Sequence, residues 1–123
     1  MNKVVVITGT TSGIGLELKN RYLKDKDIVV EINKEGEFDN ITKFYADLAD
    51  EQLIRNAFSE IEKIYEHIDV LINCAGFAVF GATELVDLEK AKNMFDVDYF
   101  AVAQCTKCAL KLMKKGAKIF NIS

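Results

Sequence analysis

Three glycines near the start of the chain, Gly9, Gly13 and Gly15, have the spacing Gly-x-x-x-Gly-x-Gly. They separate a run of β-branched residues, Lys3–Thr8, from an amphipathic segment, Ile14–Leu23. This order predicts a strand, a tight turn and a helix N-terminus, where unpaired N–H groups and a partial positive charge suit a phosphate. Glycine-rich turns also occur without a ligand, but the strand–turn–helix context favours a nucleotide-binding site.

The rest of the chain must supply the elements that position this turn. The expected strands are Lys3–Thr8, Ile28–Ile32, Thr42–Ala46, Asp69–Asn73 and Lys118–Ile122. The expected helices are Ile14–Leu23, a helix capped by Asp50 that carries an apolar stripe to Tyr65, and Leu88–Lys115, which ends at Gly116. The segment between the second and third strands is shorter than a usual parallel crossover, so we expect its helix to be vestigial or absent. Alternating strands and helices predict an α/β domain with a parallel sheet.

Polar residues follow two of these strands. Asp47 comes after the third strand, and Asn73 begins a short polar segment after the fourth. In open α/β sheets, ligands bind at the carboxyl ends of the strands. A single Asp at such an end is more often a turn or cap residue. Together with the glycine turn, however, Asp47 is expected to take part in the site.

These motifs resemble those of the short-chain dehydrogenases/reductases. Thr8-Gly9-Thr10-Thr11-Ser12-Gly13-Ile14-Gly15 is similar to that family's Thr-Gly-x-x-x-Gly-x-Gly cofactor motif, and Asp47-Leu48 to its adenine-contacting pair. Asn73-Cys74-Ala75-Gly76 is similar to its Asn-Asn-Ala-Gly, which steadies the sheet, with Cys74 replacing the second Asn. Phe120-Asn121-Ile122-Ser123 resembles its strand-five ending. The resemblance implies one α/β domain over residues 1–123, a Rossmann-like, doubly wound parallel sheet. Its five strands have the order 3-2-1-4-5, and the sheet is incomplete.

The resemblance also implies a site for NAD or NADP and an oxidoreductase that transfers hydride between nicotinamide and a carbonyl or alcohol. Lys34, at the end of the second strand, favours NADP, because a basic residue there is typical of NADP and an Asp of NAD. Glu31 takes that Asp role only if the strand is shifted. The implied cofactor-binding residues are Gly9, Thr10, Ser12, Gly13, Ile14, Gly15, Asn33, Lys34, Asp47, Leu48, Asn73, Ala75 and Gly76.

Asp98 stands where the resemblance places the Asn of a catalytic tetrad, which holds a water in a proton relay. An ionised Asp accepts hydrogen bonds as Asn does but donates none, so the relay is in question here. Asp98 is also the one charged member of a stripe formed by positions 91, 95, 98, 102, 105, 109 and 112. It is therefore either a site residue or an edge residue that reaches solvent.

The Tyr-x-x-x-Lys motif of the family, with Tyr as general acid/base, follows strand five and lies beyond Ser123. We expect no tyrosine–lysine pair of this chain to replace it. The 123-residue chain is thus expected to be an inactive cofactor-binding fragment of an enzyme. The alternative is a non-catalytic nucleotide-binding or interaction module.

The bulk composition limits the other possibilities. A formal net charge of −3 argues against a nucleic-acid partner, and no apolar run is long enough to span a membrane. We expect a cytoplasmic protein. Cys105 and Cys108 are expected to pack within a helix, and with His67 as the single histidine no metal site is expected. Strand five would form an exposed apolar edge, so we expect self-association or a homo-oligomer.

Overall fold

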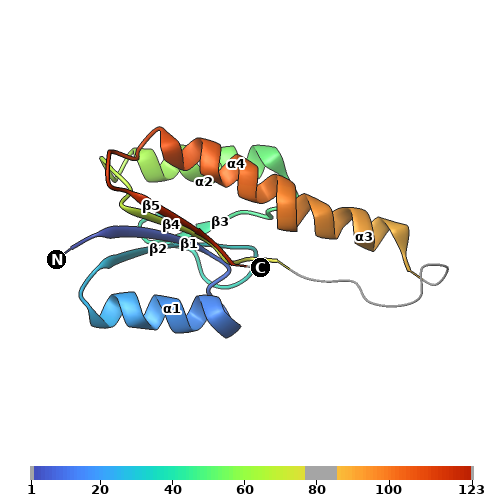
Figure 1. Ribbon diagram of the computed structural model, residues 1–123, viewed down its shortest axis with the longest axis horizontal. Helices are drawn as coiled ribbons and strands as arrows, with labels where there is room; N and C mark the ends of the chain where they lie inside the picture. Colours follow the sequence, from blue (N-terminus) through green and yellow to red (C-terminus); the bar gives the residue numbers. More distant parts are fainter. Residues whose placement is uncertain (1, 77–85, 123) are drawn as a thin grey trace.

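The protein is described by a computed structural model for residues 2–76 and 86–122. These residues form a five-stranded parallel sheet in the order β3-β2-β1-β4-β5 (Figure 1). The strands are β1 (Val4–Thr8), β2 (Ile28–Asn33), β3 (Lys43–Tyr45), β4 (Val70–Asn73) and β5 (Lys118–Asn121). The helices are α1 (Gly13–Lys24), α2 (Glu51–Glu62), α3 (Leu88–Phe95) and α4 (Ala101–Leu110), with a π-helical turn at Asp96–Phe100 between the last two. The predicted Rossmann-like fold and strand order are confirmed.

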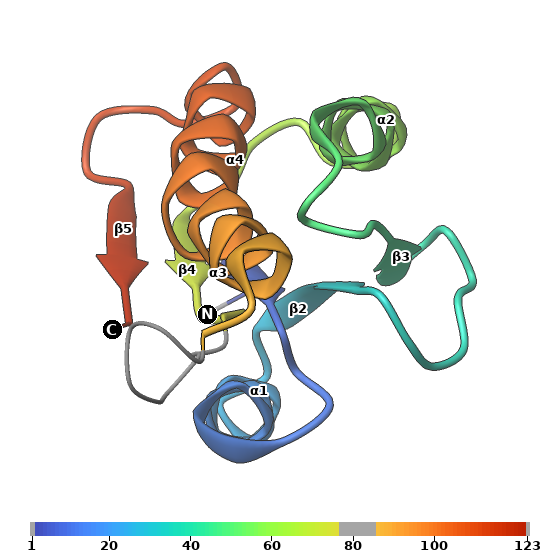
Figure 2. The same cartoon turned by 90° about the vertical axis from the view of Figure 1, so that its right-hand side faces the viewer.

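Helices cover both faces of the sheet, so the strands are apolar on both sides. Helix α1 lies on one face, and α2 and α4 lie on the other (Figure 2). Alternate residues of β1 divide between two cores: Val5 and Ile7 pack on the side of α1, whereas Val4 and Val6 pack on the side of α2 and α4. This alternation fixes the register of the sheet, since a shift by one residue would exchange the two faces.

The elements around β3 agree with the sequence expectations. Asp50 caps α2, because its carboxylate accepts the N–H groups of Gln52 at 2.9 Å and Leu53 at 3.3 Å. No helix occurs in the connection 34–42, which is described throughout. Asp39 organises this connection instead: its Oδ1 accepts N–H groups from three residues, Ile41, Thr42 and Lys43. A side chain thus replaces the usual crossover helix.

The single helix expected over Leu88–Lys115 is wrong in two respects. It is interrupted by the π-helical turn, and its last α-helical residue is Leu110, so Gly116 is not its stop. The extra residue of a π-turn rotates the following helix relative to the preceding one. As a result the predicted stripe is broken: Cys105 and Ala109 are buried, but Phe95 is exposed. The core face of α4 begins at Ala101, one position before the predicted stripe residue 102.

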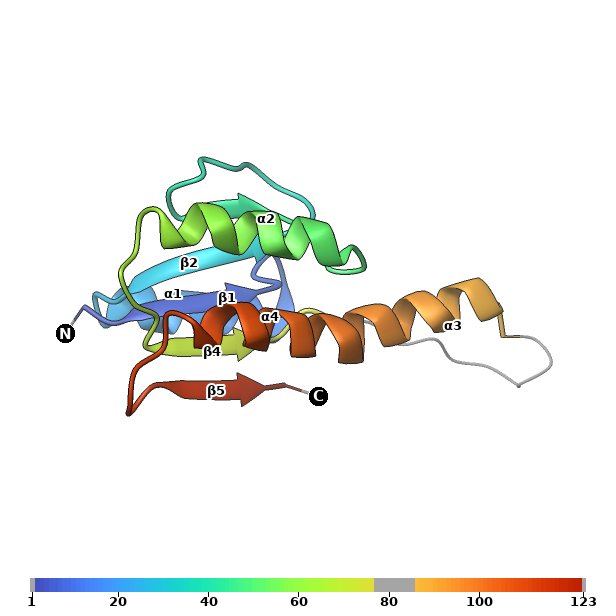
Figure 3. The same cartoon turned by 90° about the horizontal axis from the view of Figure 1, so that it is seen from above.

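The carboxyl ends of the strands and the N-terminus of α1 meet at one edge of the sheet. Figure 3 shows the strand arrows pointing to this edge and α3 extending beyond it. We call this side the carboxyl edge. Among the described residues, no helix is both long and apolar enough to cross a membrane.

Candidate functional site

The glycine turn joins β1 to α1 at the carboxyl edge. Gly9 has a φ of +75°, a conformation that costs little only for glycine. Its N–H donates to the Ile32 carbonyl of β2 at 3.1 Å. A Cβ at Gly9 would lie 2.8 Å from Cα of Ala75, in the segment that follows β4. The turn is therefore tied to β2 and closely packed against the β4 segment.

Gly15 lets α1 begin directly against this turn. It is the buried residue of α1, and a Cβ there would overlap the carbonyl oxygen of Gly9. The helix N-terminus consequently lies against the backbone of the turn. Ile14, by contrast, is 57% exposed, so it does not join Leu18 and Tyr22 in the core as its four-residue spacing predicted.

The N-terminus of α1 differs from those of α2 and α3. Asp50 and Asp87 place carboxylates on the first N–H groups of α2 and α3. Ser12, the N-cap of α1, makes no side-chain capping bond, and the first turn of α1 holds no acidic residue. The first N–H groups of α1 and the positive end of its dipole are thus available to an anion.

The side chain of Asn33 faces the glycine turn. Its Oδ1 accepts the N–H of Thr10 at 2.8 Å, and its Nδ2 donates to Oγ1 of Thr10 at 2.9 Å. Glu31 is 6% exposed and lies in register with Ile7, so β2 is not shifted. The alternative in which Glu31 occupies the end of the strand therefore does not apply.

Lys34 and Asp47 lie together at the ends of β2 and β3. The Lys34 ammonium is 3.6 Å from Oδ2 of Asp47, and the Lys34 side chain is 65% exposed. Asp47 also accepts the N–H of Ala49 at 3.0 Å, which is the turn role that a single Asp often takes. Leu48 is buried in the core beneath α2. The pair places one positive and one negative group at the carboxyl edge.

Side chains from β1 and β5 hold the end of β4 and the segment that follows it. Oγ1 of Thr8 accepts the N–H groups of Cys74 at 3.1 Å and Ala75 at 3.2 Å. Asn73 is 3% exposed, and its Nδ2 donates to Oδ1 of Asn121 in β5 at 2.9 Å. Asn73 therefore links the two strands rather than facing the edge. Thr8 was not among the expected site residues. It is the one polar residue at the end of an apolar strand, which is the sequence feature that could have identified it.

Asp98 projects from the π-helical turn toward Gly76. A Cβ at Gly76 would lie 2.5 Å from Oδ1 of Asp98. Asp98 is nevertheless exposed. Asp98 thus reaches solvent, as one of the two expectations states, and it lies beside the segment that follows β4.

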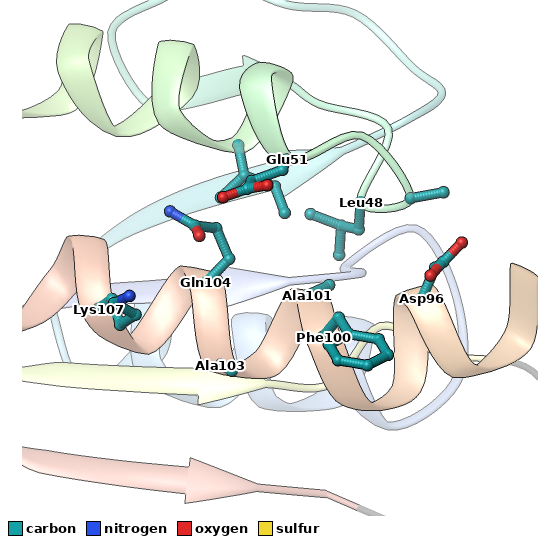
Figure 4. A pocket seen from close by; sticks show the side chains of 10 residues that line it. Leu48, Glu51, Asp96, Phe100, Ala101, Ala103, Gln104 and Lys107 are labelled. Carbon is teal, nitrogen blue, oxygen red and sulfur yellow. The ribbon is translucent and has the colours of Figure 1, made fainter.

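A groove of about 490 Å³ lies between α2 and the helix that follows the π-helical turn. Figure 4 shows Glu51 of α2 and Gln104 of α4 on its two sides, with Phe100 and Asp96 at one end. Leu48 also lines the groove. No residue of the glycine turn lines the groove.

The Tyr-x-x-x-Lys spacing does occur once in the chain, at Tyr22 and Lys26. The pair lies at the end of α1 away from the glycine turn. Tyr22 packs against the core, and Lys26 belongs to the turn into β2, with a φ of +64°. The expectation that this chain lacks the Tyr-x-x-x-Lys spacing is therefore wrong, although this pair lies away from the carboxyl edge.

The cysteines behave as packing residues. Burial raises the pKa of the Cys105 thiol to about 12, and burial also raises the pKa of Cys74. Cys108 accepts a hydrogen bond from Gln104 on its sulfur. Cys105 is therefore an inert thiol at neutral pH. Ser123, the last residue of the strand-five motif, lies outside the described residues.

Comparisons with known proteins agree with this geometry. The profile of the short chain dehydrogenase family matches residues 3–123. A probable short-chain type dehydrogenase/reductase of Helicobacter pylori is 33% identical over 98% of this chain and 47% of its own length. The ligand-free aldohexose dehydrogenase of Thermoplasma acidophilum is 26% identical, with a TM-score of 0.90 over 99% of this chain and 49% of that one.

A blue fluorescent protein from a metagenomic library, solved with NADPH, shares the fold. Its TM-score is 0.83 at 23% identity, over 98% of this chain and 55% of that one. The chain spans about half the length of the curated relatives it matches. The match nevertheless covers nearly all of this chain, from β1 to β5. The chain belongs to the short-chain dehydrogenase family.

Proposed function

We propose that this chain binds the nicotinamide dinucleotide of a short-chain dehydrogenase. The observation that carries the proposal is the N-terminus of α1, which faces the carboxyl edge with no carboxylate and no side-chain cap on its first turn. In this role the N–H groups of Gly13, Ile14 and Gly15 bind the pyrophosphate, and Ser12 lies beside it. The bound cofactor supplies hydride chemistry at its nicotinamide ring.

The remaining proposed contacts follow the carboxyl edge. Asp47 and Leu48, after β3, lie where the adenine half is expected, and Lys34 beside Asp47 is suited to the 2′-phosphate of NADP. Ala75 and Gly76, after β4, lie toward the nicotinamide half. Gly9 keeps the turn close to this segment. NADP is favoured over NAD because Lys34 is a cation at the strand end.

We further propose that hydride transfer to a carbonyl or from an alcohol requires residues that this sequence does not contain. Asp98 beside Gly76 is the proposed counterpart of the tetrad Asn, without its donor group. Tyr22 and Lys26 lie at the wrong end of α1 to act as acid/base and its partner. The chain on its own is thus proposed to bind cofactor without turnover.

The test is to give α1 the cap that α2 has. Ser12→Asp is expected to keep or raise the urea midpoint, because Asp is a good N-cap, and to weaken NADPH binding at least about tenfold by repelling the pyrophosphate. Binding is measured by titration against intrinsic tyrosine fluorescence and by calorimetry. Asp50→Ser, which alters the cap of α2, is the matched control and is expected to leave NADPH binding unchanged.

Two results would contradict the proposed binding site, and a third would contradict the proposed lack of turnover. If the unsubstituted chain shows no saturable binding of either NADPH or NADH, it is not a dinucleotide-binding protein and the interaction-module alternative is favoured. If it binds but Ser12→Asp binds equally well, the cofactor does not lie at the N-terminus of α1. Turnover of a carbonyl substrate by the chain alone would overturn the proposed lack of activity.

A further inference from the structure

Glu31 is a carboxylate in the interior of the sheet. It stands in the middle of the apolar strand β2, between Val30 and Ile32, and is 6% exposed. A buried charge is costly unless it is paired and hydrogen-bonded. The family resemblance assigns this position no role once β2 is in register, so a charge at this buried position requires a structural reason.

Both partners of Glu31 belong to the β1–α1 unit. Oγ1 of Thr10, in the glycine turn, donates to Oε1 of Glu31 at 2.6 Å. The ammonium of Lys19, in α1, is 3.2 Å from the same oxygen. Hydrogen bonds to a charged group are stronger than neutral ones, and more so away from water. Glu31 therefore binds the turn and the helix that follows it to β2.

The two hydrogen-bond donors of Thr10, its hydroxyl and its N–H, are both used within the protein. Thr10 is 1% exposed, its hydroxyl donates to Glu31 and accepts from Asn33, and its N–H donates to Asn33. Asn33 and Glu31 lie on the same side of β2, two residues apart, as the alternation of a strand requires. The side chains of Glu31 and Asn33 therefore fix the position of Thr10.

We propose that Glu31, with Asn33 and Lys19, positions the glycine turn for its ligand, so that part of the dinucleotide affinity is determined by a buried carboxylate that does not touch the dinucleotide. This inference rests on the proposed function. It also changes the role of Thr10 and Asn33 from cofactor contacts to positioning residues. The turn is preorganised before the ligand arrives, which lowers the entropy cost of binding.

The experiment compares substitutions that keep or remove the acceptor for Thr10. Glu31→Met has a similar shape and no oxygen acceptor, and it is expected to weaken NADPH binding about tenfold. Glu31→Gln keeps a carbonyl oxygen for the Thr10 hydroxyl and is expected to stay within about threefold of the unsubstituted chain. Glu17→Gln is the matched control, because Glu17 also pairs with a cation on α1, Arg21, but at an exposed position.

The dissociation constant is measured on the folded fraction, alongside the urea midpoint of each variant. Thr10→Val removes the hydroxyl from the other side of the bond and is expected to give a similar loss of affinity. The double variant Thr10→Val with Glu31→Met is expected to lose little more than either single variant, because both remove one interaction. If Glu31→Met does not fold, Thr10→Val and Glu31→Gln decide the question.

The outcomes separate this inference from the proposed function. If the unsubstituted chain binds neither NADPH nor NADH, the proposed function fails first. If it binds, and Glu31→Met or Thr10→Val lowers the urea midpoint but leaves the dissociation constant of the folded protein unchanged, Glu31 is purely structural and the inference is wrong. Equal losses of affinity in Glu31→Gln and Glu31→Met would overturn the assignment to the Thr10 hydrogen bond.

Discussion

The carboxylate of Asp98 lies against Gly76, although the two residues belong to different segments on either side of the undescribed residues 77–85. A Cβ at Gly76 would lie 2.5 Å from Oδ1 of Asp98. The π-helical turn Asp96–Phe100 carries Asp98 to this place. Turns of this kind are frequent at functional sites. A negative group thus lies beside the segment after β4, at the edge where the cofactor is proposed to bind.

Asp98→Asn is expected to strengthen NADPH binding by about twofold, because it removes one exposed negative charge beside the segment after β4, where an anionic ligand is proposed to bind. The measurement is a calorimetric titration at low salt. Glu66→Gln is the control and should change the affinity less, because Glu66 precedes β4 at the amino ends of the strands, opposite the carboxyl edge. An unchanged or weaker affinity in Asp98→Asn would show that the carboxylate does not face the bound anion.

Gly15→Ala is expected to destabilise the protein by about 1–3 kcal/mol and to abolish NADPH binding, because the new Cβ overlaps the backbone oxygen of Gly9. Urea unfolding and the fluorescence titration measure the two effects. Gly36→Ala provides the comparison: Gly36 has a φ of +118° but no atom within 4 Å of an added Cβ. The Gly36→Ala variant should lose stability through backbone strain and keep its affinity for NADPH. If Gly36→Ala and Gly15→Ala lose equal affinity, the close packing at Gly15 is not the cause.

Lys34→Ala is expected to weaken NADPH binding about tenfold while leaving NADH binding within about twofold, since only NADPH carries a 2′-phosphate for this cation. Parallel titrations with the two cofactors give the ratio. Lys63→Ala removes an exposed lysine paired with Glu60 on α2 and is the control. If Lys34→Ala weakens both cofactors equally, Lys34 does not select NADP.

Because of Asp39, the free energy of unfolding is expected to vary with pH in the acidic range. Hydrogen bonds from the backbone N–H groups of Ile41, Lys43 and Thr42 lower the pKa of Asp39 from 3.8 to about 2. The folded state thus favours the ionised form, and this stabilisation is present above the unfolded-state pKa and is lost as pH falls toward about 2. Asp39→Asn should therefore differ most from the unsubstituted chain in urea midpoint at about pH 5, and least at about pH 2. Asp25→Asn, outside this connection, is the control; a constant difference across this range would contradict the assignment.

The side of β5 that faces away from β4 is expected to cause self-association. Ile119, Phe120 and Ile122 are 37–44% exposed, and among the described strands β5 pairs with β4 alone. Sedimentation equilibrium at high concentration should give a mass above 13.8 kDa, and Phe120→Lys should shift it toward the monomer. Leu23→Lys, an exposed apolar position on α1, is the control. A strictly monomeric unsubstituted chain would contradict this prediction.

The sequence by itself determined the strands of the sheet and the place of the glycine turn. Apolar strands, the cap at Asp50 and the glycine spacing are local features, because each depends on residues close together in the chain. They were sufficient for the strand order once the family resemblance was added. The missing crossover helix was also predictable, since the connection from Asn33 to Ile41 is too short to hold one.

Only the tertiary structure decided which side chains meet. The π-helical turn carries no sequence marker that periodicity detects, so the helix from Leu88 was predicted as continuous. The amide of Asn33 bonds to Thr10, and the Glu31 carboxylate contacts Thr10 and Lys19 from two other segments of the chain. Such long-range hydrogen bonds depend on the packing of β2 against the glycine turn, because a buried polar group takes whichever partner the fold brings within reach.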